Sequence, residues 1–375
     1  MIDIKKTGMI ILACLLIIQS LMAQSGLRLQ SEQYIRVGAG YEYWHANEQS
    51  VSQFSLPMTY IYPFSDKVRM YAVTSPAFSS WYTRDSDLHM IGLSDVKIGG
   101  HILTLNDELL ITLGINVPTG KEQLTMKEYS VASQVTNPVF DFRVPCLGQG
   151  ADIQIGANTA WEVGDFIVGY GISLFLKGSY RPQKSYENIR YRPGNEVSFT
   201  WGIYREMRLF NRDMKISADV LYSGYGSDKF ADSTFFSSGN RLIVQSMSQF
   251  QEGPLGMILL IRDRIKSKNE WFYQTHYDGS HGNQFEMETQ VSYLLDPDLT
   301  VRGLTDLKVY GNNDSGLGGA TVFGLGGGVL KKVSSQLTAN GEARFNFGAL
   351  KPGSDWSSVF GMSFYAGIIY TFQGR

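Results

Sequence analysis

The chain has 375 residues and carries 33 Lys and Arg against 35 Asp and Glu, so it lacks the basic excess that nucleic-acid binding requires. Charged residues make up 18% of it, below the roughly 25% of soluble domains. The mean hydropathy of −0.13 excludes a bundle of membrane helices but fits a membrane β-barrel, in which only every second strand residue faces lipid.

The first 23 residues have the organisation of a secretory signal peptide. Lys5 and Lys6 precede an apolar run over residues 9–18, and small and polar residues follow up to Ala23. The apolar run is too short to cross a bilayer. We therefore expect cleavage near Ala23 and a mature domain of residues 24–375, which retains 31 basic and 34 acidic residues.

The two cysteines raise one alternative and exclude two kinds of site. Ile11-Leu12-Ala13-Cys14 resembles a lipoprotein cleavage box, but cleavage there would leave a strongly apolar new N-terminus. Otherwise only Cys146 remains in the mature chain. A single cysteine can form neither an internal disulfide nor a zinc site built on thiolates.

The mature sequence alternates in hydrophobicity with a period of two, which indicates β-strands. In residues 152–162, for example, Ile153, Ile155 and Trp161 point one way while Asp152 and Glu162 point the other. The candidate strands repeatedly reach about ten residues, the length of a tilted membrane strand and longer than the 5–6 residues usual in soluble sheets. No later segment has the roughly 18 consecutive apolar residues of a membrane helix.

Sixteen candidate strands are separated by connections that alternate between short and long. The strands start near residues 33, 51, 66, 88, 107, 151, 165, 195, 213, 239, 253, 283, 298, 319, 335 and 357. Short polar turns such as Gly164-Asp165 and Glu252-Gly253 alternate with long loops such as 119–150 and 264–282. Short periplasmic turns opposite long extracellular loops are the plan of outer-membrane barrels. The sequence thus predicts an all-β, transmembrane, antiparallel up-and-down barrel.

Two features leave the strand number open at fourteen or sixteen. The strands near 239 and 253 carry apolar residues on both faces, and the N-terminal segment could stay unpaired or lie inside the barrel. Arg205 falls on the lipid face of its strand, which indicates a bulge nearby or a position at the membrane interface.

The longest loop, 119–150, is predicted to fold into or over the mouth of the barrel. Residues 124–131 could form a short helix, and the segment that follows is apolar. We therefore do not expect this loop to extend freely into water. The candidate gating residues are Leu124, Met126, Tyr129, Phe140 and Leu147. If the loop is a constriction, deletion of residues 124–145 should raise the conductance.

The last strand has the form of an assembly signal. Aromatic and aliphatic residues alternate almost to the end, and the pattern Gly367-x-x-Tyr370-x-Phe372 resembles the signal that the outer-membrane insertion machinery recognises. Such signals usually end at the aromatic residue, whereas three residues follow here.

The polar strand faces are expected to line the lumen. The candidates are Arg36, Glu42, Lys97, His101, Asp152, Lys177, Asp219, Glu286, Glu288, Arg302, Asp306, Lys308, Glu342 and Arg344. A hairpin with its turn at Pro297 would set Glu286 opposite Lys308 and Glu288 opposite Asp306. The near balance of signs favours a solvated, salt-bridged wall over a strongly ion-selective filter.

No catalytic, metal or cofactor site is predicted. His276-x-Asp278-x-x-His281 has ligand types at a plausible spacing, but it lies in a polar loop that collects such residues by chance. His101 could serve a hydrolase, yet no Gly-x-Ser-x-Gly marks a nucleophile. The glycines at 324–328 sit in a strand with no helix after it, so they are no phosphate loop.

Three stretches together resemble one known group. They are Gly92-Leu93-Ser94-Asp95-Val96-Lys97-Ile98-Gly99-Gly100, Asn116-Val117-Pro118-Thr119-Gly120-Lys121 and Leu147-Gly148-Gln149-Gly150-Ala151-Asp152. Their order is similar to the outer-membrane proteins associated with the meta-pathway of phenol degradation, which are related in style to long-chain fatty-acid and aromatic-hydrocarbon channels. The motifs are structural and none is catalytic. The resemblance implies passive uptake of small apolar or aromatic compounds.

The leading hypothesis is therefore a monomeric outer-membrane channel for small hydrophobic or aromatic solutes, without cofactor, whose partners are lipid, the insertion machinery and the solute. A structural or adhesive surface barrel and an outer-membrane hydrolase are the alternatives.

Overall fold

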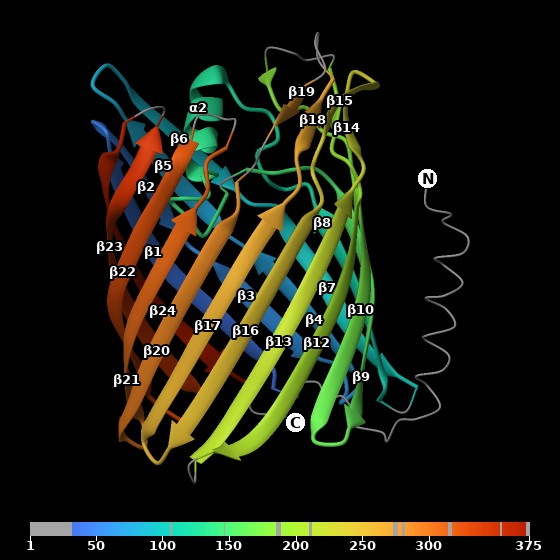
Figure 1. Cartoon of the computed structure of the whole chain (residues 1–375), viewed down its shortest axis with the longest axis vertical. Helices are drawn as coiled ribbons and strands as arrows, with labels where there is room; N and C mark the ends of the chain where they lie inside the picture. Colours follow the sequence, from blue (N-terminus) through green and yellow to red (C-terminus); the bar gives the residue numbers. More distant parts are fainter. Residues whose placement is uncertain are drawn as a thin grey trace.

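A computed structural model describes residues 32–105, 107–145, 147–184, 189–209, 212–272, 277–279, 282–313, 317–352 and 355–372. Within this part of the chain, sixteen antiparallel strands form a closed transmembrane barrel (Figure 1). The ring closes where β1 (Tyr34–Ala46) pairs with β24 (Ser357–Thr371), from Tyr34 opposite Thr371 to Ala46 opposite Val359. The proposed signal peptide, Cys146, His276, His281 and residues 373–375 lie outside the described residues.

Three of the strands are interrupted near their middle. They are β2 (Gln49–Ser55) with β3 (Met58–Pro63), β4 (Val68–Thr74) with β5 (Pro76–Tyr82), and β6 (Asp87–Leu93) with β7 (Val96–Thr104). Pro57 interrupts the first because it has no N–H for the ladder. The third strand contains a bulge between β6 and β7. Val73 pairs with Lys97 and Pro76 pairs with Leu93, so this strand has one residue more than its neighbour between the two pairs.

The other strands run without a break from end to end. They are β8 (Leu109–Val117), β9 (Asp152–Val163), β10 (Phe166–Lys177), β12 (Glu196–Leu209), β13 (Arg212–Tyr225), β16 (Arg241–Glu252), β17 (Leu255–Lys266), β20 (Gln284–Asp296), β21 (Leu299–Tyr310), β22 (Leu317–Lys332) and β23 (Leu337–Pro352). The fourteen-strand alternative is wrong, because β1 is paired along both edges.

Arg205 lies on the outer face without any bulge. Its strand pairs in unbroken register with both neighbours, so the expectation of a bulge is wrong. Its guanidinium instead lies 2.9 Å from the Asp165 carboxylate and 4.8 Å from the centre of the Phe166 ring, at a short turn. The charge thus sits at the short-turn end of the barrel, and it has a partner there.

The outer face is mainly apolar, and the inner face carries most of the charged side chains of the strands. The exposed apolar residues on the outer face include Ile35, Phe54, Ile91, Leu113, Ile155, Phe199, Phe323 and Leu325. No helix of the described residues is long and apolar enough to cross a membrane.

A small second sheet stands on the rim at the extracellular end, where the long loops lie. Its strands are β11 (Tyr191–Arg192), β14 (Ser227–Phe230), β15 (Ser233–Ser237), β18 (Asn269–Trp271) and β19 (Tyr277–Gly279). We call it the crown sheet. Its aromatic residues pack on one another; Phe236, for example, has its ring 4.6 Å from that of Trp271.

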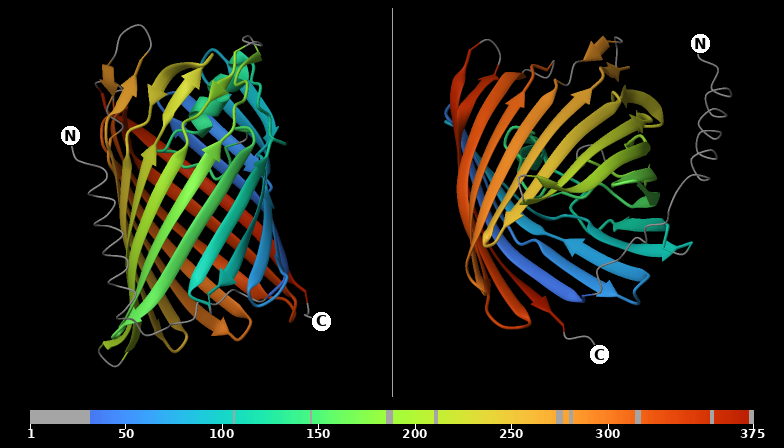
Figure 2. Two further views of the ribbon diagram at one scale, coloured as in Figure 1. Left: turned by 90° about the vertical axis from the view of Figure 1, so that its right-hand side faces the viewer. Right: turned by 60° about the horizontal axis from the view of Figure 1, so that its bottom comes forward.

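The loop over residues 119–150, called the lumen loop below, contains α2 (Met126–Val135). The helix begins at a capping box, in which Thr125 accepts from the N–H of Glu128 and the Glu128 carboxylate accepts from the N–H of Thr125. Figures 1 and 2 place α2 inside the extracellular rim of the barrel.

Candidate functional site: the occupied mouth of the barrel

The lumen loop fills one side of the barrel with an apolar core. Val131 and Val139 are 0% and 1% exposed, although both belong to a loop. The buried cluster consists of Trp44, Ala46, Val51, Ala77, Met90, Leu124, Val131, Ala132, Val135, Val139, Phe140, Val144, Tyr310, Ala320, Val322, Leu350 and Val359. Its barrel members come from eight consecutive strands of the ring, from β21 through β24 and β1 to β6. Burial of this much apolar surface holds the loop in place.

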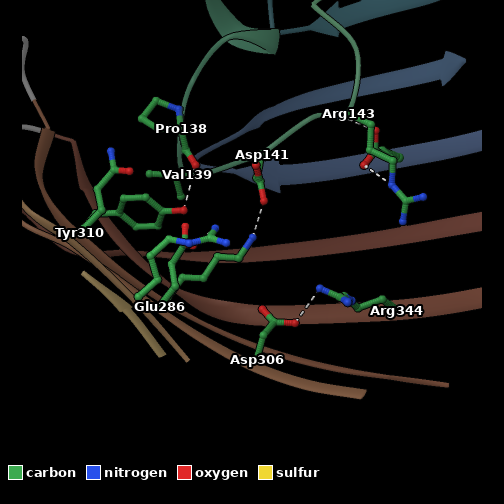
Figure 3. Close-up of polar contacts among 12 residues, drawn as sticks. Pro138, Val139, Asp141, Arg143, Glu286, Asp306, Tyr310 and Arg344 are labelled. Atoms are coloured by element: carbon green, nitrogen blue, oxygen red, sulfur yellow. Dashed lines mark hydrogen bonds and ion pairs between the residues drawn. The ribbon is translucent and has the colours of Figure 1, made fainter. Parts of the chain in front are cut away.

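Polar contacts fix the loop to β21 at one end of this arc. The Lys308 ammonium lies 2.5 Å from the Asp141 carboxylate, and the Tyr310 hydroxyl donates to the Pro138 carbonyl at 2.8 Å (Figure 3). Lys308 is only 8% exposed, so its charge depends on this partner.

Arg143 fixes the loop to β23, β24 and β1. Its backbone N–H donates to Glu42 at 3.1 Å, its guanidinium lies 3.5 Å from the Glu342 carboxylate, and it stacks 5.0 Å from the ring centre of Tyr365. Beside it, the Gln53 amide donates to the Val144 carbonyl at 2.8 Å. The loop therefore touches the wall through side chains from strands that are far apart in the sequence.

The neck of the loop is closed by one buried carboxylate. Asp95, in the bulge between β6 and β7, accepts from the N–H of Gly120 at 2.9 Å and from the N–H of Gln149 at 2.7 Å. A Cβ on Gly120 would lie 2.6 Å from the Cα of Gly148, so both positions require glycine for this approach. The three motifs of the family resemblance thus meet at a single point, the neck.

The five candidate gating residues divide between two environments. Leu124 and Phe140 are buried, and Leu147 packs against the buried cluster. Met126 and Tyr129 are 59% and 48% exposed, and Tyr129 lines a cavity along α2. The apolar pattern alone did not separate the two groups.

Strand pairing puts the lumen candidates on the same face as Glu42 and Lys308, which contact the lumen loop. Glu286 lies opposite Lys308 and Glu288 lies opposite Asp306, as the hairpin predicts. The ion pairs themselves differ from that expectation. Glu286 binds Arg262 and Arg264, both at 3.1 Å, and Lys308 turns to the loop.

The remaining lumen candidates do not gather in one site. Asp306 and Arg344 form an ion pair at 2.9 Å, and Arg36 lies 5.8 Å from the ring centre of Tyr365. His101 lies 3.3 Å from the Thr112 hydroxyl. Lys97, Asp152, Lys177, Asp219, Glu288 and Arg302 are distributed around the inner wall.

Sequence reasoning missed four charged residues of this region. Arg262 and Arg264 were missed because β17 carries apolar residues on both faces, so its alternation does not show which face is inward. The pairing of β16 with β17 in the hairpin after residue 252 places both arginines inward. Asp141 and Arg143 lie in an irregular segment, where no periodicity indicates a direction.

The other half of the inner wall is not reached by these contacts. Within the described chain, no hydrogen bond or ion pair joins residues 126–145 to the strands β8 to β17. Along this arc the inward face includes Leu221, Ile243, Met247, Ile258 and Leu260. Met247 is 39% exposed there, so apolar surface is left open inside the barrel.

A cavity of about 230 Å³ lies where this open arc meets the crown sheet. Its lining is Gln149, Asp152, Lys177, Tyr180, Tyr191, Pro193, Gly194, Tyr225, Asp228, Phe236 and Ser238. Burial, with the Asp228 carboxylate nearby, raises the pKa of Tyr180 to about 12, so its phenol stays protonated at neutral pH. A second cavity, of about 240 Å³, lies along α2 and shares Tyr180 with the first.

One arrangement outside the barrel has the residue types of a hydrolase. The Ser80 hydroxyl lies 2.9 Å from Nδ1 of His89, and Nε2 of His89 lies 3.0 Å from the Asp87 carboxylate. However, Ser80 is 1% exposed beneath the imidazole, so the hydroxyl cannot meet a substrate in this geometry. Among the described residues, no group of three His, Cys, Asp or Glu could hold a metal ion.

Comparisons with known proteins return similar barrels but no family. No family model matches the chain, and no curated protein matches its sequence. OpdK from Pseudomonas aeruginosa is 7% identical over 91% of this chain and 99% of its own, with a TM-score of 0.46. OprB from Pseudomonas putida is 11% identical over 91% and 94%, with a TM-score of 0.43. A bacterial polysaccharide outer membrane secretin is 10% identical over 92% and 100%, with a TM-score of 0.45.

Proposed function

We propose that this protein is an outer-membrane channel for the passive entry of small hydrophobic or aromatic solutes, narrowed by its lumen loop. The observation that carries the proposal is the half-filled lumen. Residues 126–145 of the loop are fixed to the arc from β21 to β6, and within the described chain no hydrogen bond or ion pair joins them to the strands β8 to β17. On that side the lumen loop bonds through the backbone of Leu124 to Pro182 and Lys184, which follow β10.

The charges around the loop favour a solute without a large net charge. Lys308, Arg143 and Arg344 are matched by Asp141, Glu342 and Asp306. A balanced wall gives little ion selectivity. The open apolar side chains on the other arc, among them Met247 and Leu260, would be covered favourably by an apolar ring.

Planar-bilayer recordings test this function. The purified protein is expected to conduct ions in small steps, and benzyl alcohol is expected to interrupt the current more than glycerol at the same concentration. The variant Leu260→Gln, which makes the open arc more polar, should reduce that difference. Absence of any conductance, or equal effects of both solutes, would favour a structural surface barrel.

A further inference from the structure

The cavity under the crown sheet is built from segments that meet only in the folded chain. Asp152 begins β9, Lys177 ends β10 and Tyr225 ends β13, while Tyr191 and Phe236 belong to the crown sheet. The cavity therefore lies at the extracellular mouth, beside the open arc, and Gln149 at the end of the lumen loop forms part of its lining. A solute entering along that side would meet it first.

Four aromatic side chains line the cavity. The rings of Tyr180 and Tyr191 meet edge to face with their centres 5.6 Å apart, and Tyr225 and Phe236 add two further rings. Aromatic rings bind another ring through stacked or edge contacts. A cavity of roughly 150 Å³ is enough to bind benzene, so about 230 Å³ accommodates a one-ring molecule with a substituent.

The two carboxylates of the cavity already have donors. Asp152 accepts from the Asn116 amide and from the N–H of Gly178, both at 3.0 Å. Asp228 accepts from the Tyr191 hydroxyl and, at 2.7 Å, from the N–H of Gly194. Neither carboxylate needs a cation or a donor from a ligand.

The Lys177 ammonium, by contrast, has aromatic rings beside it and no ion-pair partner among the described residues. It lies 5.8 Å from the ring centres of Phe175 and Tyr225, and no carboxylate of the described chain lies within ion-pair distance of it. Asp152 is its register partner, but that carboxylate is turned to other donors. Three ammonium donors are therefore available to an acceptor inside the cavity.

From this combination we infer that the cavity is a binding subsite for an aromatic monocarboxylate, with the carboxylate on Lys177 and the ring packed against the aromatic side chains that line it. A charge-assisted hydrogen bond to the ammonium is stronger than one to a neutral acceptor. The inference rests on the proposed channel and names the class of solute that its mouth selects.

Calorimetric titration of the detergent-solubilised protein tests the subsite without any need for conduction. Benzoate is expected to bind at least 10-fold more tightly than benzyl alcohol, which has the ring without the charge, and than acetate, which has the charge without the ring. Lys177→Met should weaken benzoate binding by about 10- to 100-fold, the effect of losing a hydrogen bond to a charged group, and leave benzyl alcohol unchanged. Lys177→Arg should restore most of the affinity.

The matched control is Lys127→Met, which removes an exposed lysine from α2 at the same end of the barrel. It should bind benzoate like the wild type. Equal binding of benzoate and benzyl alcohol by the wild type would overturn the inference, as would tight benzoate binding by a folded Lys177→Met variant. If either result occurs while benzyl alcohol still interrupts the current, the subsite is wrong but the proposed channel is supported. If benzoate binds as expected but the protein does not conduct, the subsite is supported and the channel is wrong.

Discussion

Asp95 shows how a single side chain can fix a loop of about thirty residues. Its two oxygens accept hydrogen bonds from backbone N–H groups at the two ends of the lumen loop and so hold these ends together. The residue is 7% exposed, which makes each of these hydrogen bonds costly to lose. In the sequence, Asp95 is one residue of the first motif, 92–100, and nothing there indicates its partners. Its role follows from the bulge that turns it toward the loop.

Asp95→Ala should release the neck. It leaves two buried N–H groups without acceptors, at a cost of about 1–3 kcal/mol each, so protease cleavage between residues 120 and 149 should become at least 10-fold faster in the folded barrel. Asp95→Asn keeps one acceptor and should be intermediate. The control is Asp165→Ala, which removes an exposed ion pair with Arg205 at the short-turn end. Wild-type cleavage rates for Asp95→Ala would show that the neck is held by other contacts.

Gly120→Ala should disturb the same neck by a steric route. The added Cβ would meet the Cα of Gly148 at 2.6 Å and the Leu93 carbonyl at 2.7 Å, both of them backbone atoms that cannot swing aside. We expect a loss of about 1–3 kcal/mol in loop stability, measured as faster hydrogen exchange at residues 147–150. Gly303→Ala is the control, because nothing lies within 4 Å of its Cβ position. Equal exchange in the two variants would contradict the close contact.

At the scale of the element, the sequence was informative where periodicity is strong. The alternation in residues 152–162 and 285–293 gave the facing of β9 and β20, because lipid and lumen impose opposite demands on successive residues. β16 and β17 remained ambiguous, since an apolar inner face removes that contrast. The helix was expected over residues 124–131 and is found at Met126–Val135, shifted because Thr125 is the cap.

The capping box of α2 makes the stability of this helix depend on pH. Burial by itself would raise the pKa of Glu128, but hydrogen bonds from Lys121 and Thr125 outweigh it and hold that pKa below its ordinary value. A depressed carboxylate pKa adds stability that is present above the unfolded pKa and is lost as the pH falls through the folded value. The protection factors of the amides at residues 126–131, which correct exchange for its intrinsic pH dependence, should therefore fall below about pH 4.

Thr125→Ala should reproduce part of that effect at neutral pH. Loss of an N-cap costs about 1 kcal/mol, so exchange in the first turn of α2 should be about five-fold faster. Ser133→Ala, later in the same helix, serves as the control. If the wild-type protection factors in α2 do not fall at low pH, the Glu128 contacts do not stabilise α2.

At the scale of the whole molecule, loop parity was the most useful pattern in the sequence. It gave sixteen strands, because a closed antiparallel barrel must alternate its connections between two ends. The placement of the lumen loop could only be expected in outline. Its contacts with Glu42, Lys308 and Tyr310 join residues up to 172 positions apart, and no local pattern encodes such pairs. The aromatic cavity was missed for the same reason.

Whether the lumen loop narrows a channel is tested most directly by the single-channel conductance after removal of residues 124–145. The deletion keeps Asp95, Gly120 and Gln149, so the neck can still close and the barrel strands remain intact. We expect the deleted protein, folded in planar bilayers, to conduct in steps several times larger than those of the wild type, and to lose the preference for benzyl alcohol over glycerol. Conductance steps of unchanged size in a correctly folded variant would show that the lumen loop does not narrow the channel.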